Sequence, residues 1–380
     1  MYSNREIRIN KKVYAMNDAK KLKFKKLVKI ITIVTICIVV AIVGYILYGK
    51  YQLSKIPALS FKEALEYTTK ENKNAVITVG IVKNGNISYK VYGENGEELP
   101  GKVHTYEIGS LTKTLTSALI SKAIDEGKVS LDDTIDKYLD LPEGKHYPTI
   151  MQLLTHTSGY KAYYFESPMV KSFFTGRNDF YGITDEMVLK QIKKAKLKKQ
   201  AYSFNYSNFG YATLGLVLEA VYDKEYTALI NEYVQKDLGL TATMISDGNG
   251  DLSNYWDWKT GDAYMSAGAV TSNIVDMLSY LELQMKEQGY FERCHESLMK
   301  ISTSSKSYEA MGIHMDEIAM AWIIDRENHI IWHNGGTDDY NCYMGFNVET
   351  QTGVIIISNL SPSYRIPATV LGVKLLTEIK

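Results

Sequence analysis

The order of apolar and polar positions predicts β-strands near both ends of the folded part of the chain and helices between them. The apolar run at 75–82 and the alternating run at 87–92 are joined by Lys83-Asn-Gly-Asn86, a sequence typical of a β-hairpin turn. Further strand patterns lie at 319–325, 329–332, 343–348 and 353–358, and helix patterns at 60–70 and 368–379. Strands at both ends around a helical middle predict one sheet built from distant segments, with a helical subdomain inserted.

The first fifty residues follow a different pattern. Lys and Arg crowd positions 1–29, and the next uncharged run, Ile30 to Tyr48, is rich in Ile and Val. That run is about long enough to cross a hydrocarbon layer of roughly 30 Å, and it is apolar on all sides, unlike an amphipathic core helix. No convincing cleavage site follows it, which argues against a signal peptide. We therefore expect a basic cytoplasmic leader at 1–29, a transmembrane helix at 30–49, a linker at 50–59 and an extracytoplasmic domain beyond.

Charge and cysteine content narrow the possible functions. The chain has 43 Lys and Arg against 43 Asp and Glu, a balance that argues against a nucleic-acid partner. Cys37 lies within the apolar run, and Cys294 and Cys342 are either paired or reduced thiols. The cluster Cys294-His295-Glu296 lacks a second Cys/His pair at ligand spacing, so no metal site is predicted.

The strongest chemical signal is Ser110-Leu-Thr-Lys113 at the start of an apolar helical pattern that ends near Gly127. Residues three apart share one face of a helix, so the lysine amine can reach the serine hydroxyl. Free backbone N–H groups at a helix start also favour a nearby oxyanion. A neutral lysine can remove the serine proton, so this pair predicts a nucleophilic serine hydrolase.

The same Ser-x-x-Lys spacing occurs twice more. Ser158-Gly-Tyr-Lys161 contains a glycine that suits a turn rather than a helix start, and Ser297-Leu-Met-Lys300 lies in a charged helical stretch. Position along the chain therefore favours Ser110 over Ser158 and Ser297.

Two further motifs can complete such a site. Tyr206-Ser-Asn208 offers a phenol that can exchange protons beside an amide that can bind a substrate carbonyl, or it is a turn that caps the following helix. His333-Asn-Gly-Gly336 follows a β-rich stretch. Its glycines let a substrate backbone lie close, and the Gly336 N–H can join that of Ser110 in an oxyanion hole. The alternative is a simple Asn-Gly hairpin turn.

Taken together, these motifs resemble the penicillin-recognising serine hydrolases, which include class C β-lactamases, D-alanyl-D-alanine carboxypeptidases, D-aminopeptidases and related esterases. The resemblance covers roughly residues 60–375 and includes Gln152-Leu-Leu-Thr-His-Thr-Ser-Gly159 and Ser266-Ala-Gly268. It implies an α/β (α+β) fold, in which helices flank an antiparallel sheet. A mainly helical subdomain at about 125–285 would be inserted into a hydrolase domain of 60–380.

Carried over residue by residue, the resemblance implies the catalytic roles. Ser110 would be the acylated nucleophile, Lys113 its base and Tyr206 the proton relay. His156 invites assignment as a general base, but its counterpart in the family looks structural.

The resemblance also implies the substrate-binding residues. Asn208 would bind substrate and the lysine, His333 would replace the lysine of the family's Lys-Thr-Gly motif, and Gly335 and Gly336 would border the substrate. A histidine carries positive charge only part of the time at neutral pH, and Asp338 stands where relatives often have a small or apolar residue. Both departures argue against β-lactamase activity and a carboxylate-binding pocket.

The sequence thus predicts a single-pass membrane protein whose extracytoplasmic serine hydrolase domain needs no cofactor. The expected substrate is a D-amino-acid amide or ester of the cell envelope, from peptidoglycan, teichoic acid or a small molecule. The alternatives are a β-lactamase or general esterase, and a penicillin-binding sensor or scaffold without turnover. The sequence leaves the oligomeric state open.

Overall fold

The computed structural model describes residues 26, 29, 31–44, 49 and 54–379, which form two compact units, 1–58 and 59–380. In the first unit, residues 31–44 are helical, and their large apolar side chains are 49% to 63% exposed. None of the helices among the described residues combines the length and apolarity needed to cross a membrane. The predicted leader at 1–29 and the ends of the predicted transmembrane helix at 30–49 lie largely outside the described residues.

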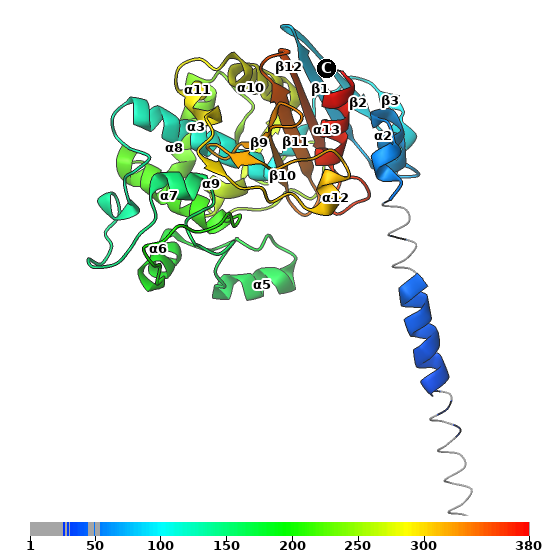
Figure 1. Ribbon diagram of the computed structural model, residues 1–380, viewed down its shortest axis with the longest axis horizontal. Coiled ribbons are helices and arrows are strands. Elements are labelled where there is room, and N and C mark those ends of the chain that lie inside the picture. Colours follow the sequence, from blue (N-terminus) through cyan, green and yellow to red (C-terminus); the bar gives the residue numbers. More distant parts are fainter. Residues whose placement is uncertain (1–25, 27–28, 30, 45–48, 50–53, 380) are drawn as a thin grey trace, which may run out of the picture. The chain divides into compact units, whose positions relative to one another are not determined.

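The second unit contains the strands and the helices that pack around them (Figure 1). Its helices are α2 (Phe61–Thr69), α3 (Thr112–Asp125), α4 (Ile150–Leu154), α5 (Ser167–Thr175), α6 (Asp185–Lys194), α7 (Asn208–Tyr222), α8 (Tyr226–Glu232), α9 (Met265–Gly268), α10 (Ile274–Lys286), α11 (Tyr290–His295), α12 (Lys306–Glu309) and α13 (Ala368–Glu378). Its strands are β1 (Ile77–Lys83), β2 (Asn86–Tyr92), β3 (Glu98–Leu99), β4 (Thr105–Glu107), β5 (Met244–Ile245), β6 (Val270–Asn273), β7 (Met299–Lys300), β8 (Glu317–Ile318), β9 (Ile323–Asp325), β10 (Ile330–Gly336), β11 (Asn341–Asn347) and β12 (Thr352–Ser358). Short helical turns include η3 (Gly109–Leu111) and η5 (Tyr233–Asp237).

A nine-stranded antiparallel sheet forms the centre, in the order β3-β2-β1-β12-β11-β10-β9-β8-β7. The first and last long strands pair directly, with Ile77 opposite Ser358, which confirms the prediction of one sheet built from distant segments. The capping box at Ser60 that starts α2 also confirms its predicted start. A second sheet has the order β4-β6-β5, and two of its strands, β5 and β6, lie in the part of the chain predicted to be helical. Its strands of two to four residues are too short to give a periodic pattern.

Helices cover both faces of the central sheet. Gly353 of β12 faces Leu281 and Met285 of α10, whereas Tyr343 of β11 faces Gly372 of α13. Tyr343 lies opposite Ile356, and positions 353 and 356 point to opposite sides because side chains alternate along a strand. Every residue of β11 and β12 is buried as a result, which explains their continuous apolar sequences.

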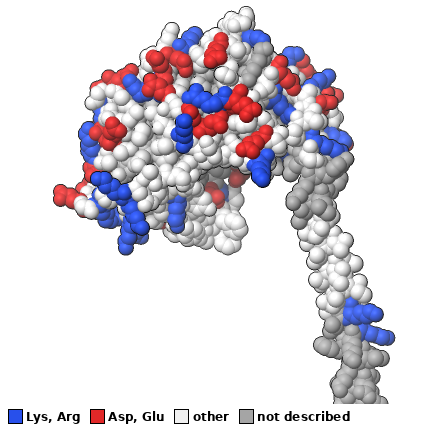
Figure 2. All heavy atoms as spheres, viewed as in Figure 1, with Lys and Arg blue, Asp and Glu red and all other residues white. Residues whose placement is uncertain are grey.

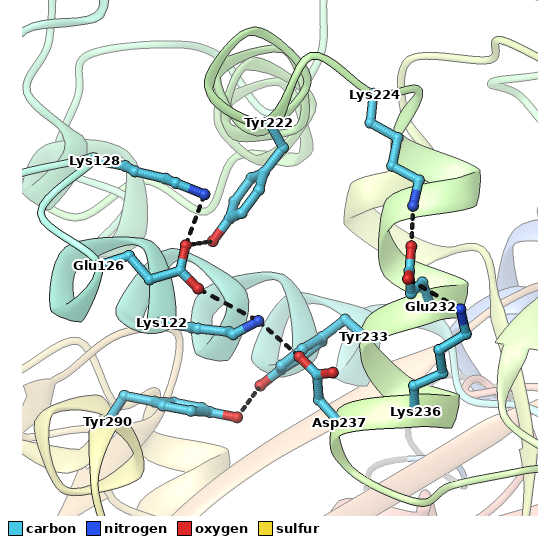
Figure 3. A network of polar contacts seen from close by, with 10 residues as sticks. All are labelled: Lys122, Glu126, Lys128, Tyr222, Lys224, Glu232, Tyr233, Lys236, Asp237 and Tyr290. Atoms are coloured by element: carbon cyan, nitrogen blue, oxygen red, sulfur yellow. Dashed lines mark hydrogen bonds and ion pairs between the residues drawn. The ribbon is translucent and has the colours of Figure 1, made fainter.

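Polar contacts connect the C-terminal ends of α3 and α7 and the turn η5 (Figure 3). The Lys122 ammonium lies 2.7 Å from Asp237 and 3.4 Å from Glu126, so the last turn of α3 is tied to η5. Glu126 also accepts a 3.0 Å hydrogen bond from Tyr222 at the end of α7. Over the face in view, basic and acidic side chains lie among one another (Figure 2).

Two predicted strands differ from the structure near the site. Residues 319–322 of the predicted 319–325 strand form a tight turn, with Ala321 at φ +72°. They are buried, so their apolar pattern reflects burial rather than strand structure. The predicted 329–332 strand continues to Gly336, and the reversal follows at Thr337, whose N–H donates to Tyr340 O at 2.9 Å. The Asn334-Gly335 pair is therefore part of β10 and not a hairpin turn.

Candidate active site

Ser110 lies at the centre of η3, between β4 and α3. The preceding Gly109 has φ +46°, a conformation that favours glycine. A side chain at Gly109 would also collide with the backbone of Gly336, because its Cβ would lie 2.6 Å from the Gly336 nitrogen. Glycine at this position therefore holds the half-buried Ser110 directly beside the end of β10.

Lys113 is in the first turn of α3 and is fully buried. Its Nζ lies 3.1 Å from Ser110 Oγ and donates to the Ala267 carbonyl at 2.6 Å. None of the described carboxylates forms an ion pair with this amine, and burial lowers the pKa of Lys113 well below its usual value. A neutral amine beside the hydroxyl is suited to accept the serine proton.

The Tyr206 ring lies close to the Lys113 amine. Lys113 Nζ is 4.9 Å from the centroid of its ring. Burial raises the pKa of Tyr206, and its contact with the Ser110 hydroxyl offsets part of this rise. The phenol is therefore protonated at neutral pH and can donate a proton to a group that leaves the serine-bound intermediate.

Asn208 is the first residue of α7, whose start is capped by the Ser207 side chain. It lines a pocket of about 50 Å³ with Ser110 and Gly336. The other residues of that wall are Phe180, Trp256, Trp258, Tyr264, Ala267 and Gly268. Three predicted site residues thus meet in one pocket, but the hydrogen bonds of the described residues include none between Asn208 and Lys113.

The predicted glycine pair explains how β10 reaches the nucleophile. A Cβ on Gly335 would lie 2.1 Å from the Ile108 oxygen and 2.9 Å from the Ser110 nitrogen. The close approach that Gly335 permits is therefore to the chain's own η3 segment rather than to a substrate. Gly336 follows in the same strand and lines the pocket, so its N–H and that of Ser110 are available as a pair of oxyanion donors.

His333 lies on β10, one strand position before Asn334, and is 3% exposed. Its Nδ1 is 2.5 Å from the Asn334 carbonyl, so the neutral ring carries its proton on Nδ1. Burial, which disfavours the charged ring, is the main cause that lowers the pKa of His333 to about 3. The expectation of a part-time positive charge at neutral pH is therefore wrong, because the buried ring is neutral.

The other candidate residues have different surroundings. His156 is buried, accepts the Ser207 N–H on Nδ1 at 3.0 Å and packs 4.4 Å from the Tyr206 ring. This agrees with its structural interpretation, since it supports the segment that carries Tyr206. Ser158 binds the backbone N–H of Tyr160, and Ser297 is exposed between α11 and β7, so neither begins a helix as Ser110 does.

The sequence left open whether two of the cysteines form a disulfide, and in the structure they do not. Cys294 and Cys342 are both buried and unpaired. Cys342 Sγ donates to the Ile108 carbonyl at 3.0 Å, beside the nucleophile segment. His295 hydrogen-bonds to Gln284, and the described residues contain no group of three metal-ligating side chains.

Sequence reasoning did not identify Glu107, which joins two walls of the pocket. The buried carboxylate accepts hydrogen bonds of 2.6 Å from Thr337 Oγ1 and from the Trp256 N–H. Asp338, which follows Thr337, accepts the Trp256 indole N–H at 3.1 Å. Burial raises the pKa of Glu107 to about 7. The available signal was an acidic residue two positions before the segment that carries the nucleophile.

Known proteins resemble this chain in sequence and in structure. A family described as Beta-lactamase matches residues 61–374. Protein flp of Staphylococcus aureus (strain MRSA252) is 25% identical over 75% of this chain and 59% of that protein. The chain thus spans less than two thirds of the length of that relative.

A second relative is covered more fully. The D-alanyl-D-alanine-carboxypeptidase/endopeptidase AmpH of Escherichia coli (strain K12) is 25% identical over 75% of this chain and 80% of its own length. Among solved structures, a beta-lactamase/D-alanine carboxypeptidase from Yersinia pestis, complexed with citrate, superimposes with a TM-score of 0.66 at 20% identity. That match covers 87% of this chain and 99% of the other, and it confirms the predicted arrangement of an antiparallel sheet and helices.

Proposed function

Because the chain belongs to the beta-lactamase family of serine hydrolases, we propose that it hydrolyses D-amino-acid esters or amides of the bacterial cell envelope through an acyl-enzyme on Ser110. The observation that carries this proposal is the 3.1 Å approach of the buried Lys113 amine to Ser110 Oγ. Burial keeps that amine neutral, which is the state a general base needs.

The geometry supports a two-step reaction. Ser110 Oγ attacks the carbonyl carbon while its proton passes to Lys113 Nζ, and the carbonyl oxygen gains negative charge beside the Ser110 and Gly336 N–H groups. The bond to the leaving group then breaks, and the leaving atom takes a proton from Tyr206, which regains one from Lys113. Water then adds to the acyl carbon with Lys113 as base, and the acid product leaves as the Ser110 hydroxyl is restored.

The neutral His333 favours substrates without a carboxylate at that position. A fixed cation there would bind the carboxylate of a penicillin or of a C-terminal D-alanine, but a histidine with a pKa of about 3 supplies none at neutral pH. Esters and neutral amides have no carboxylate at that position, so the missing cation does not weaken their binding. This supports hydrolysis of D-amino-acid esters over β-lactamase activity.

The link to D-amino-acid substrates comes from the relatives. AmpH of Escherichia coli is named for activity on D-alanyl-D-alanine, and the similar protein of known structure from Yersinia pestis is named a beta-lactamase/D-alanine carboxypeptidase. The Ser110-x-x-Lys113 and Tyr206-x-Asn208 motifs of this chain suit such chemistry, and we extend it to this chain as a proposal. A scaffold that is never acylated would have no use for a lysine amine at the serine. Repeated turnover would distinguish an enzyme from a sensor that is acylated once.

We also propose that the hydrolase domain lies outside the cytoplasmic membrane, anchored by 30–49. The all-round apolar exposure of residues 31–44 and the basic positions before them support this. Protease added to intact protoplasts should digest the domain after residue 50 and leave the first residues protected. A protected hydrolase domain would contradict the topology and the envelope substrate.

A substrate panel tests the activity itself. Full-length protein should hydrolyse D-alanyl methyl ester and D-alanyl amides with repeated turnover, faster than D-alanyl-D-alanine or nitrocefin. A stoichiometric burst without turnover on every substrate would instead identify a sensor. Efficient nitrocefin hydrolysis would identify a β-lactamase.

A further inference from the structure

A second pocket is lined by the proposed proton donor. It has a volume of about 220 Å³, and its wall includes Tyr206, His333 and Asn334. The smaller pocket that holds Ser110 and Gly336 does not include these three residues. Tyr206 nevertheless contacts the Ser110 hydroxyl, so the larger pocket begins next to the nucleophile.

The chemistry of acyl transfer assigns these two spaces. The oxyanion donors must surround the acyl carbonyl, whereas the proton donor must face the atom that leaves. Because Tyr206 is the proton donor of the proposed reaction, the larger pocket that it lines is where the leaving group would lie.

The wall of this pocket is apolar and aromatic. It contains no Lys, Arg, Asp or Glu. Its apolar and aromatic members besides Tyr206 include Phe204, Tyr308, Met315, Ile323 and Trp332. Ile323 and Trp332 are 5% and 2% exposed, so the inner part of the wall is fixed in the core. Such a surface stabilises a bound alkyl or aryl group by removing it from water, and it offers a charged leaving group no partner.

The polar residues of the same wall are two histidines, Asn334, and the tyrosines Tyr206 and Tyr308 with their hydroxyls. The His156 Nδ1 accepts the Ser207 N–H, so the neutral ring carries its proton on Nε2, which has no partner among the described residues. The His333 ring carries its proton on Nδ1 toward the Asn334 carbonyl, which leaves Nε2 as an acceptor. Uncharged donors and acceptors of this kind suit a hydroxyl, the group that an ester releases.

We propose that this pocket is the leaving-group subsite and that it takes an uncharged, apolar alcohol, so that the preferred substrates are esters of apolar alcohols. The inference rests on the proposed acyl-enzyme reaction and specifies its substrate class. When the acyl carbon–oxygen bond breaks, the alcohol oxygen takes the Tyr206 proton, and Lys113 returns a proton to the phenol. The alcohol then leaves through the pocket, and the acyl group stays on Ser110.

A series of D-alanine esters with one acyl group tests this assignment. From the methyl to the butyl ester, kcat/KM should rise by about fourfold per added methylene, since each becomes buried. The glycerol ester, of similar size but polar, should remain near the methyl ester. A flat series, or a glycerol ester that is preferred over the butyl ester, would overturn the assignment.

Variants of the wall give a second measure. Met315→Lys places a charge in the half-buried part of the pocket and should reduce the butyl-to-methyl ratio of kcat/KM by at least about tenfold, whereas Met315→Leu should keep it. Val275→Lys adds the same charge on the exposed side of α10, where the side chain is 49% exposed, and should leave the ratio unchanged. An unchanged ratio in Met315→Lys would contradict the subsite.

Labelling by a fluorophosphonate, whose leaving group is only fluoride, separates this inference from the proposed function. If Ser110 is labelled and esters are hydrolysed but alkyl length has no effect, the subsite alone is wrong. If Ser110 is not labelled and no ester is hydrolysed, the proposed reaction fails, and the subsite fails with it.

Discussion

Burial distinguishes Lys113 from an ordinary lysine. Its side chain is fully buried without an ion pair among the described carboxylates, so the cost of desolvating an ammonium favours the neutral amine. The spacing of Ser110 and Lys113 was readable from the sequence, because helix geometry alone puts both on one face. The lowered pKa was not readable, since it depends on the segments that close over the amine, among them the one carrying Ala267.

Replacing the base should slow the first chemical step. In Lys113→Ala, we expect fluorophosphonate labelling of Ser110 to fall by about 10²- to 10⁴-fold, the range that general-base catalysis contributes. Ser158→Ala and Ser297→Ala should label at the wild-type rate, because neither serine lies in the pocket. Labelling that survives Lys113→Ala unchanged would mean that another group activates the serine.

His333 is a second residue whose environment matters more than its type. At the sequence level it predicted a partly charged ring between pH 6 and 8. In the structure, burial lowers the pKa of His333 to about 3, so hydrolysis should show no inflection from this ring in that range. His333→Lys should increase penicillin acylation, relative to methyl-ester hydrolysis, by about tenfold or more, as a charge-assisted hydrogen bond to the carboxylate would. Rate constants for both substrates at several pH values would measure this, and an equal change in both would contradict it.

At the scale of elements, the site depends on how β10 meets η3. The apolar run before His333 predicted the strand, but the Asn334-Gly335 pair favoured a turn within β10, whereas the chain reverses between Thr337 and Tyr340. The strand continues because pairing with β11, including Gly335 opposite Cys342, outweighs the local turn preference. Contacts of this kind between distant segments are not visible in local sequence.

Glu107 connects β4 to two other elements of the site. Glu107→Ala removes the acceptor for both Thr337 and Trp256, so the loop of Trp256 and the end of β10 lose a shared anchor. We expect kcat/KM for ester hydrolysis to fall by about tenfold to a hundredfold, as small misplacements of a site do. Thr337→Val, which removes only one of these hydrogen bonds, should lose less. Steady-state kinetics would decide, and wild-type kinetics in Glu107→Ala would show that the anchor is unnecessary.

At the scale of the whole molecule, the sequence predicted one sheet built from distant segments and a helical subdomain inserted between them. Both could be predicted because long apolar strands and capped helices are strong local signals. Ser60 and the hairpin at Lys83 to Asn86 are examples. It did not predict β4, β5 or β6, which are stabilised by pairing across the subdomain rather than by their own sequence. The turn at Ala321 escaped prediction for a similar reason, since its residues are apolar through burial.

The buried neutral histidine should also make folding sensitive to acid. A histidine with a folded pKa of about 3 and an unfolded value near 6.5 binds a proton only in the unfolded chain between these values. The free energy of unfolding should therefore be highest above pH 6.5 and fall by up to about 1.4 kcal/mol per pH unit for this residue as the pH decreases. Urea titrations of the purified chain at pH 7.5, 6 and 5 would measure the slope.

His333→Gln should reduce that slope by about one proton, because it removes one group that the unfolded chain protonates. His329→Gln is the matched control, since the His329 side chain is 63% exposed, and its slope should match that of the wild type. An unchanged slope in His333→Gln would mean that the ring is not held neutral in the folded protein.

The most direct test of the central claim is to locate the covalent intermediate. Full-length protein is mixed with D-alanyl methyl ester, quenched with acid during turnover and digested for peptide mass mapping. The proposed mechanism predicts a D-alanyl adduct on the peptide that contains Ser110, accumulating to a greater extent when deacylation is slowed. An adduct on Ser158 or Ser297, or sustained hydrolysis without any adduct on Ser110, would contradict it.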